Sequence, residues 1–320
     1  MGAGARPSAP FRLSESMPKT PYYGGQAVIE GVMVRGPHTV AVAVRRPDGT
    51  VAVKSEALGG LYTGLLRRTP FIRGVVILWE TLALGIRALG YSARVAAGED
   101  ESEASGAYVW GTVAVTFVLA AAVFFAGPVL LTGWLQGVLG GTGAVIVEGL
   151  LRLGLFLAYV GAIGLVPDVR RVFAYHAAEH RTIHAYEAGR PLEVEAVRPF
   201  PNAHPRCGTG FLLMVMLVAL IVFTLMGTPP LWWRVLSRVV LLPVIASLSY
   251  EAIRLGMLIE RIPVLNWLLK PNLLLQSLTT RDPDDDQIEV ALAALQGVLA
   301  AEEGAAASAA GGLRQPRGCP

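Results

Sequence analysis

The sequence predicts an α-helical integral membrane protein with about four transmembrane helices, a small N-terminal β unit and cytoplasmic amphipathic helices. Two observations lead to this fold class. Hydrophobic residues make up 53% of the 320 residues and charged residues only 16%, whereas an average soluble domain carries about 25% charged residues. Segments 108–132 and 208–227 contain no Asp, Glu, Lys, Arg or His, and each reaches the roughly 20 apolar residues that cross a bilayer as a helix.

The region before the first span is expected to form a small β unit behind a disordered tail. Residues 1–20 are polar and rich in Pro, Ser and Ala, without the apolar core of a signal peptide. In residues 21–60, alternating valines flank a Pro-Asp-Gly sequence at 47–49, a pattern typical of a β-hairpin. Three polar side chains of this unit are interpreted as surface or turn residues: Glu30, Arg35 and His38.

The membrane domain, residues 61–303, contains two further spans that carry charged residues. Span 144–166 includes Glu148 and Arg152, which are four residues apart and can pair within a helix. Span 235–255 has its charged residues near the ends: Arg238, Glu251 and Arg254.

Segment 72–95 is also apolar, but its charged residues Arg73, Glu80 and Arg87 recur every seventh position. This spacing puts them on one stripe of a helix, which favours a helix lying at the membrane surface over one that crosses it.

The distribution of Lys and Arg predicts the orientation of the spans, because cytoplasmic loops carry an excess of positive residues. Residues 1–107 contain twelve Lys or Arg and segment 167–206 contains six, whereas the loop 136–143 contains none. Both termini and the long loop 167–206 are therefore expected in the cytoplasm.

The C-terminal region is expected to hold an amphipathic helix over 284–303, followed by a disordered tail over 304–320. The acidic residues 282–286 are interpreted as caps that complement the helix dipole. The two cysteines, Cys207 and Cys319, provide no disulfide framework. A net charge of +3 without a basic run predicts no nucleic-acid partner.

The loop 167–206 carries the most distinctive motif, the stretch YHAAEHRTIHAYE at 175–187, with three of the five histidines in the chain. His176, Glu179 and His180 form H-x-x-E-H, the order in which inverted zincins place two zinc ligands and a general base. We therefore expect a divalent metal, Zn²⁺, on the two histidines. His184 lies about 12 Å along the helix from His176, too far to share one ion with it, and is expected in the second shell or at the surface.

A catalytic zinc site needs a third protein ligand and leaves one position for water. Two residues are candidates. His204, in the stretch HPRCGTGF, is slightly favoured because it is close to the motif in the chain. Glu251, in the fourth span, is kept beside it because a carboxylate within a span is costly to bury and indicates a function. Arg206 is expected to stabilise negative charge that develops on the substrate.

Two hypotheses of function follow. The first is a metal-dependent hydrolase with a cytosol-facing site, embedded in the lipid bilayer and acting on a peptide or a lipid head group. The second is a non-catalytic scaffold or transporter component with a structural or sensing site. Within the second hypothesis, no span looks broken by an unwound polar segment, which favours a scaffold over a transporter component.

Four stretches resemble the YqhQ-like family of bacterial multi-span membrane proteins: GGQAVIEGVMVRGP at 24–37, YHAAEH at 175–180, HPRCGTGF at 204–211 and LTTRDPDDDQIEVAL at 278–292. The resemblance implies a location in the bacterial inner membrane. The family is one of unknown function whose members are often labelled as metal-dependent enzymes. It points to the same site residues and adds one cysteine: His176, Glu179, His180, His204 and Cys207. It implies no particular substrate.

Overall fold

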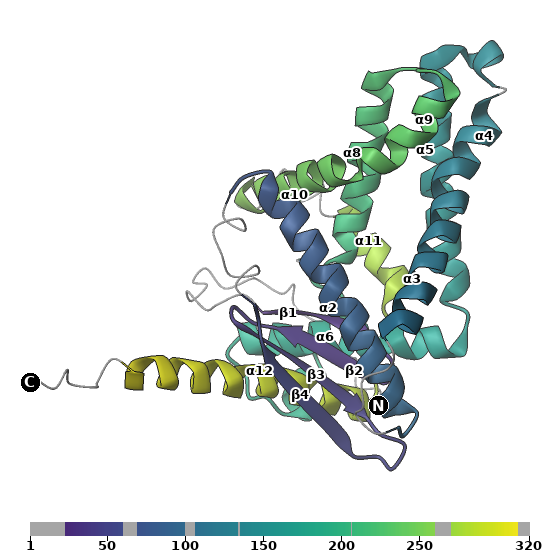
Figure 1. The fold of residues 1–320 in the computed structure, drawn as a ribbon. Coiled ribbons are helices and arrows are strands. Elements are labelled where there is room, and N and C mark those ends of the chain that lie inside the picture. The colour runs from purple at the N-terminus through teal and green to yellow at the C-terminus, as the bar shows by residue number, and fades with distance from the viewer. Residues whose placement is uncertain are drawn as a thin grey trace, which may run out of the picture.

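The computed structural model describes residues 23–59, 69–99, 106–133, 135–205, 207–259 and 270–312. Arg206, Cys319 and the predicted tail 1–20 lie outside these residues. The molecule has two parts, a small sheet covered by helices and a helical bundle that projects away from it (Figure 1). The candidate site lies where these parts meet.

The N-terminal part is a four-stranded antiparallel sheet in the order β1 (Gly24–Val28), β2 (Gly31–Arg35), β3 (Thr39–Arg45) and β4 (Val51–Ala57). The predicted hairpin is confirmed, because Arg45 pairs with Val51 and Val44 pairs with Ala52. Gly49 closes the turn with a φ of 86°, a left-handed conformation that glycine adopts without steric cost.

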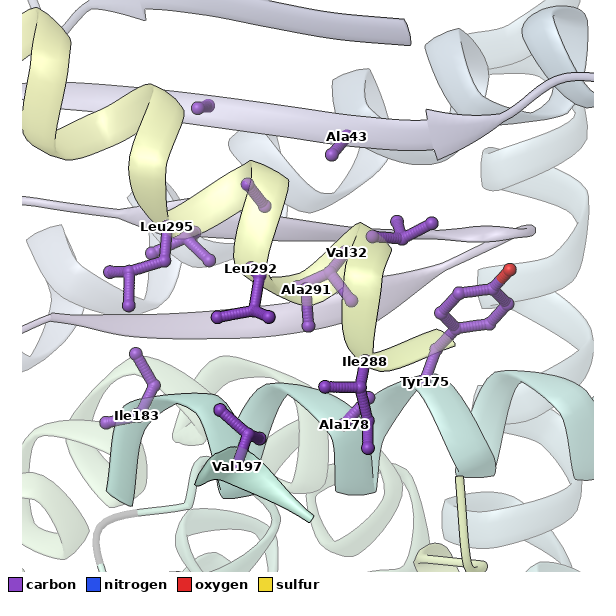
Figure 2. Packing of buried hydrophobic residues seen from close by; sticks show 14 of the residues in the cluster. Val32, Ala43, Tyr175, Ala178, Ile183, Val197, Ile288, Ala291, Leu292 and Leu295 are labelled. Carbon is purple, nitrogen blue, oxygen red and sulfur yellow. The ribbon is translucent and has the colours of Figure 1, made fainter. Parts of the chain in front are cut away.

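Helices cover both faces of the sheet. Strand residues that alternate along β2 and β3, such as Val34 and Ala43, pack with α6 (Pro167–Glu187) and α12 (Asp285–Gly312) in the largest buried apolar cluster (Figure 2). The intervening residues, such as Met33 and Val40, face α2 (Ile72–Ala96). Because both of their faces are buried, the central strands β2 and β3 are apolar at nearly every position.

Helix α12 begins with the cap that the acidic run predicted. The Gln287 amide donates to Asp284 Oδ1 over 2.8 Å, and the Gln287 side chain accepts from the Asp284 amide over 3.1 Å. This reciprocal pair is a capping box. The helix continues past residue 303 to Gly312, where we expected a disordered tail, because its last turns are rich in alanine, the strongest helix former.

Within the described residues, three helices of the bundle are long and apolar enough to cross a membrane: 114–133, 136–163 and 209–226. They correspond to α3 (Gly106–Ala121) with η2 (Ala122–Ala126) and α4 (Gly127–Gly133), to α5 (Gln136–Ile163), and to α8 (Thr209–Met226). These match three of the predicted spans.

The fourth predicted span is a bent pair, α9 (Leu231–Val240) and α10 (Leu242–Ile259), with an angle of 51° between them. Pro243 is the second residue of α10, and a proline ring cannot be accommodated inside a continuous helix without a kink. The sequence analysis did not anticipate this bend, although the break lies at the apolar residue Leu241 and not in an unwound polar segment.

Two shorter helices complete the described chain, α7 (Val194–Val197) in the loop after α6 and α11 (Lys270–Thr279) beside α8. Helix α2 is not among the candidate spans of the described chain. Its Leu84 and Ala88 pack on the sheet, while Val75, Trp79 and Leu82 form an exposed apolar stripe. That stripe accords with the prediction of a helix at the membrane surface.

The turn between β1 and β2 is joined to α6 by an ion pair. Glu30 has a left-handed φ of 50°, which is uncommon for a residue with a side chain. Its carboxylate accepts from Arg171 over 2.6 and 2.5 Å and from the Tyr175 hydroxyl over 3.2 Å. Glu30 is thus a turn residue, as interpreted, and it also fixes the hairpin on the helix.

The Glu30 ion pair predicts a pH dependence of stability. The hydrogen bonds from Arg171 hold the pKa of Glu30 below its ordinary value, so the stabilisation is present above the unfolded-state pKa of about 4.3 and is lost as the pH falls through the folded-state pKa. We expect Glu30→Gln to unfold at a lower temperature than the wild type at pH 7, with the gap narrowing below pH 4. Thermal unfolding of both proteins in detergent, at pH 7 and below pH 4, measures this difference in unfolding temperature. A difference that does not change with pH would contradict a stabilising ion pair at Glu30.

Candidate metal centre

Helix α6 carries the histidine motif, and its ends are set by sequence. Pro167 starts the helix with a preset φ, and Asp168 in the first turn complements the helix dipole. Gly189, with a φ of 63°, ends it. The motif therefore lies on a rigid, mostly buried helix between the sheet and the bundle.

The first donor group consists of His176, His180 and Cys207, whose ligand atoms all lie within 4.8 Å of one another. His176 Nε2 is 3.2 Å from Cys207 Sγ, and the two imidazole rings have centroids 4.4 Å apart. Thr209 fixes the sulfur from the start of α8, since its hydroxyl lies 3.2 Å from Sγ and its amide donates to Sγ over 3.4 Å.

Both histidines of this group are oriented by backbone carbonyls. His176 Nδ1 is 2.9 Å from the Thr279 carbonyl oxygen, and His180 Nδ1 is 2.6 Å from that of Asn202. A carbonyl oxygen only accepts, so each Nδ1 carries the hydrogen and each Nε2 keeps a lone pair. Metal-binding histidines are held in the same way, with the second nitrogen donating to a carbonyl or carboxylate.

Glu179 lies beside this group on the same helix. It is 5% exposed, and its Oε2 is 3.6 Å from His180 Nε2. Burial raises the pKa of the Glu179 carboxyl, while electrostatic interactions with the neighbouring His176 and His204 side chains oppose the rise. Gly25 of β1 packs directly on the carboxylate side chain: a Cβ at this position would lie 2.9 Å from Glu179 Cγ.

A second donor group lies further along α6 and consists of His184, Glu187 and His204. His204 Nε2 is 3.5 Å from Glu187 Oε2, and the His184 and His204 rings have centroids 4.4 Å apart. His184 is therefore a buried member of a cluster, although its sequence position suggested only the second shell or the surface.

The structure brings some of the predicted site residues together and separates others. His176, His180 and Glu179 are neighbours as predicted, and Cys207 takes the place of the third donor. His204 belongs to the neighbouring group. Glu251 is bound elsewhere: its carboxylate accepts from the Arg73 side chain and the Phe71 amide. Arg206 lies outside the described residues, so its predicted role stays a prediction.

A pocket of about 470 Å³ opens beside the loop whose carbonyls hold His180 and His184. Apolar and charged groups share its wall, which is lined by Pro201, Asn202, Ala203, Leu273, Ser277, Thr280, Arg281 and Asp282. It is an open hollow on the surface and not an enclosed cavity.

A separate ionic cluster is buried in the bundle around Glu148. The predicted pair with Arg152 is confirmed at 2.7 Å. Arg234 and Arg238 of α9 also bind the same carboxylate, at 2.8 and 2.9 Å. The Arg234 side chain is only 1% exposed.

The fold and the clusters define a class of protein: a mainly helical chain with three or four apolar helices and a small antiparallel sheet that packs against a histidine-rich helix. The chain belongs to the family described as "Protein of unknown function (DUF1385)", whose family model matches residues 69–301.

Among individual proteins, the chain is similar to the "Uncharacterized protein YqhQ" of Bacillus subtilis (strain 168). The two are 36% identical over 297 residues, which cover 88% of this chain and 93% of that protein. The resemblance found in the four sequence motifs is thereby confirmed. No solved structure matches the chain.

Proposed function

We propose that the chain is a metal-dependent hydrolase of the bacterial inner membrane, with its active site at the cytosolic surface. The observation that carries this proposal is the orientation of His176 and His180. Both rings donate through Nδ1 to backbone carbonyls, and both therefore present an Nε2 lone pair toward Cys207 Sγ.

The donor set fits a zinc ion. Imidazole nitrogen and thiolate sulfur are the ligands that Zn²⁺ prefers, and three protein ligands leave a fourth position for water. Ligand atoms that share a tetrahedral ion lie roughly 3.4–3.6 Å apart, given bonds of about 2.1 Å to nitrogen and 2.3 Å to sulfur. The 3.2 Å between His176 Nε2 and Cys207 Sγ is close to that separation.

Glu179 is placed to act as the general base. A bound zinc ion would supply a water molecule whose pKa is lowered toward about 7. The Glu179 carboxylate would take a proton from the attacking water and return it to the leaving group. Its neighbours support this role, because His180 lies within 3.6 Å and Gly25 leaves room for the carboxylate beside the strand.

The membrane location rests on three apolar helices and one bent pair of the required length. The excess of Lys and Arg in segments 1–107 and 167–206 supports cytoplasmic termini and a cytoplasmic α6. A site at the junction of bundle and sheet suits a substrate at the membrane surface, such as a peptide or a lipid head group. The neighbouring pocket, with Leu273 next to Arg281 and Asp282, offers contacts to both the apolar and the charged parts of such a substrate.

Metal content tests the proposal. We expect the wild type, purified in detergent without chelator, to hold zinc, and His180→Ala to lose the zinc bound at this site. The matched control is His38→Ala, because His38 is the histidine outside the cluster and is exposed. Wild-type protein without stoichiometric transition metal would refute the proposal.

Glu179→Gln separates catalysis from metal binding. This variant is expected to keep the metal and to lower the hydrolysis of a peptide or phospholipid panel by about 10²–10⁴-fold, the usual contribution of a general base. Unchanged hydrolysis in Glu179→Gln would exclude the catalytic role and leave a structural metal site.

The bundle favours a second candidate function, a transporter component. The specific observation is the 51° break between α9 and α10 next to the buried Glu148 cluster, since broken helices beside charged residues are typical of transporters. In that case Glu148 variants that still fold would lose transport while keeping the metal.

A further inference from the structure

We infer that His184, Glu187 and His204 form a second metal site, separate from the site at His176, His180 and Cys207. The two groups share no ligand, although the His180 and His204 rings have centroids only 5.7 Å apart. The inference does not depend on the proposed hydrolase activity.

The helix supplies two of the three donors on one face. His184 and Glu187 are three residues apart on α6, and this spacing brings their side chains to the same side of a helix. His184 Nε2 is 3.0 Å from the Ala203 carbonyl oxygen, so Nε2 carries the hydrogen and Nδ1 is the nitrogen with the lone pair. As at the first site, a backbone carbonyl sets the tautomer that metal binding requires.

The third donor comes from a loop residue that is held in place by a buried glutamine. The His204 amide donates to Gln276 Oε1 over 2.8 Å, and Gln276 Nε2 donates to the His204 carbonyl over 2.9 Å. Gln276 is 0% exposed. A loop whose backbone is clamped from both sides presents its side chain with little freedom, which is the condition for a preorganised ligand.

The distances fit a shared ion. His204 Nε2 and Glu187 Oε2 are 3.5 Å apart, and two ligand atoms on one tetrahedral ion at about 2.1 Å are separated by roughly 3.4 Å. His184 and His204 are buried and Glu187 is half-buried, so the site is largely closed to solvent. Two imidazoles and a carboxylate suit Zn²⁺ or another divalent transition metal.

The position of this site gives it a structural role. An ion there would hold the segment containing His204 against α6. His204 is only three residues before Cys207 in the chain. The second ion would thereby fix the sulfur of the first site, and it would join the cytosolic helix to the start of α8.

Cobalt titration in detergent distinguishes the two sites, because only a site with Cys207 gives a thiolate-to-cobalt absorption band. We expect the wild type to bind two equivalents. Glu187→Gln should bind one equivalent with the thiolate band intact, and Cys207→Ala should bind one equivalent without the band. Glu195→Gln, an exposed acid on α7, is the matched control and should bind two.

The possible results divide cleanly. A wild type that binds one equivalent with the thiolate band, or a Glu187→Gln variant that still binds two, would overturn the second site. One equivalent in the wild type without the thiolate band would support the second site and refute the first. If Glu187→Gln fails to fold, the wild-type stoichiometry together with Cys207→Ala decides the question.

Discussion

Glu148→Gln is expected to destabilise the helical bundle by about 3–5 kcal/mol, the cost of removing one partner from a buried ion pair. The Glu148 carboxylate accepts hydrogen bonds from Arg152, Arg234 and Arg238, and all four side chains are at most 5% exposed. Without the carboxylate, three buried guanidinium groups lose the negative charge that faces them. The cost is large because neither protein interior nor lipid solvates a charge as water does.

The measurement is thermal or chemical unfolding in detergent, together with the yield of membrane-inserted protein. Glu251→Gln is the matched control, because Glu251 also pairs with an arginine from another helix but keeps 21% of its side chain exposed. The control should lose much less stability and keep its full metal content. Equal losses in the two variants would show that the Glu148 cluster contributes no more than a surface ion pair.

The Glu148 cluster also shows which contacts could be predicted from the sequence and which could not. Glu148 and Arg152 are four residues apart on one helix, so their pairing followed from local geometry. Arg234 and Arg238 join the same carboxylate from a helix more than 80 residues away in the chain. No local pattern encodes that contact, because it depends on how the bent pair α9 and α10 packs against α5.

The candidate metal centre also combines contacts within one helix, which the sequence predicted, with contacts between distant elements, which it did not. Helical spacing predicted that His176, Glu179 and His180 would lie together, since all three are on one helix. The contacts of His204 and Glu251 depend on how the helices α6, α8, α11 and α2 pack. The number of residues between two positions in the chain does not predict that packing. Chain proximity and an intramembrane carboxylate were therefore weak guides, and Cys207 was the donor that the fold brought closest to the two histidines.

The bend in the fourth span had a signal that the sequence interpretation left unused. Pro243 lies in the middle of segment 235–255, and a proline inside a helix removes a backbone hydrogen bond and clashes with the preceding turn. The apolar composition of the segment predicted a span, and the proline determined that this span is divided.

The sheet is part of the candidate site, because β1 packs against Glu179, the residue proposed as the general base. A methyl group at Gly25 would lie 2.4 Å from the Met33 carbonyl oxygen and 2.9 Å from Glu179 Cγ. The first atom belongs to the backbone of β2, which pairs with β1 and cannot move without breaking the ladder. Glycine at this position therefore allows the strand to approach α6 closely.

Gly25→Ala is accordingly expected to lower stability by about 1–3 kcal/mol, the usual cost of overpacking a well-packed site. It should also displace Glu179 and reduce hydrolysis, because a catalytic group moved by about 1 Å can lose on the order of 10²-fold in rate. Gly24→Ala is the matched control, since a Cβ there meets no atom within 4 Å. Unfolding temperature, zinc content and hydrolysis of the same substrate panel are compared for both variants. If the two alanine variants behave alike, Gly25 does not hold the strand against Glu179, and the sheet serves only to support α6 and α12.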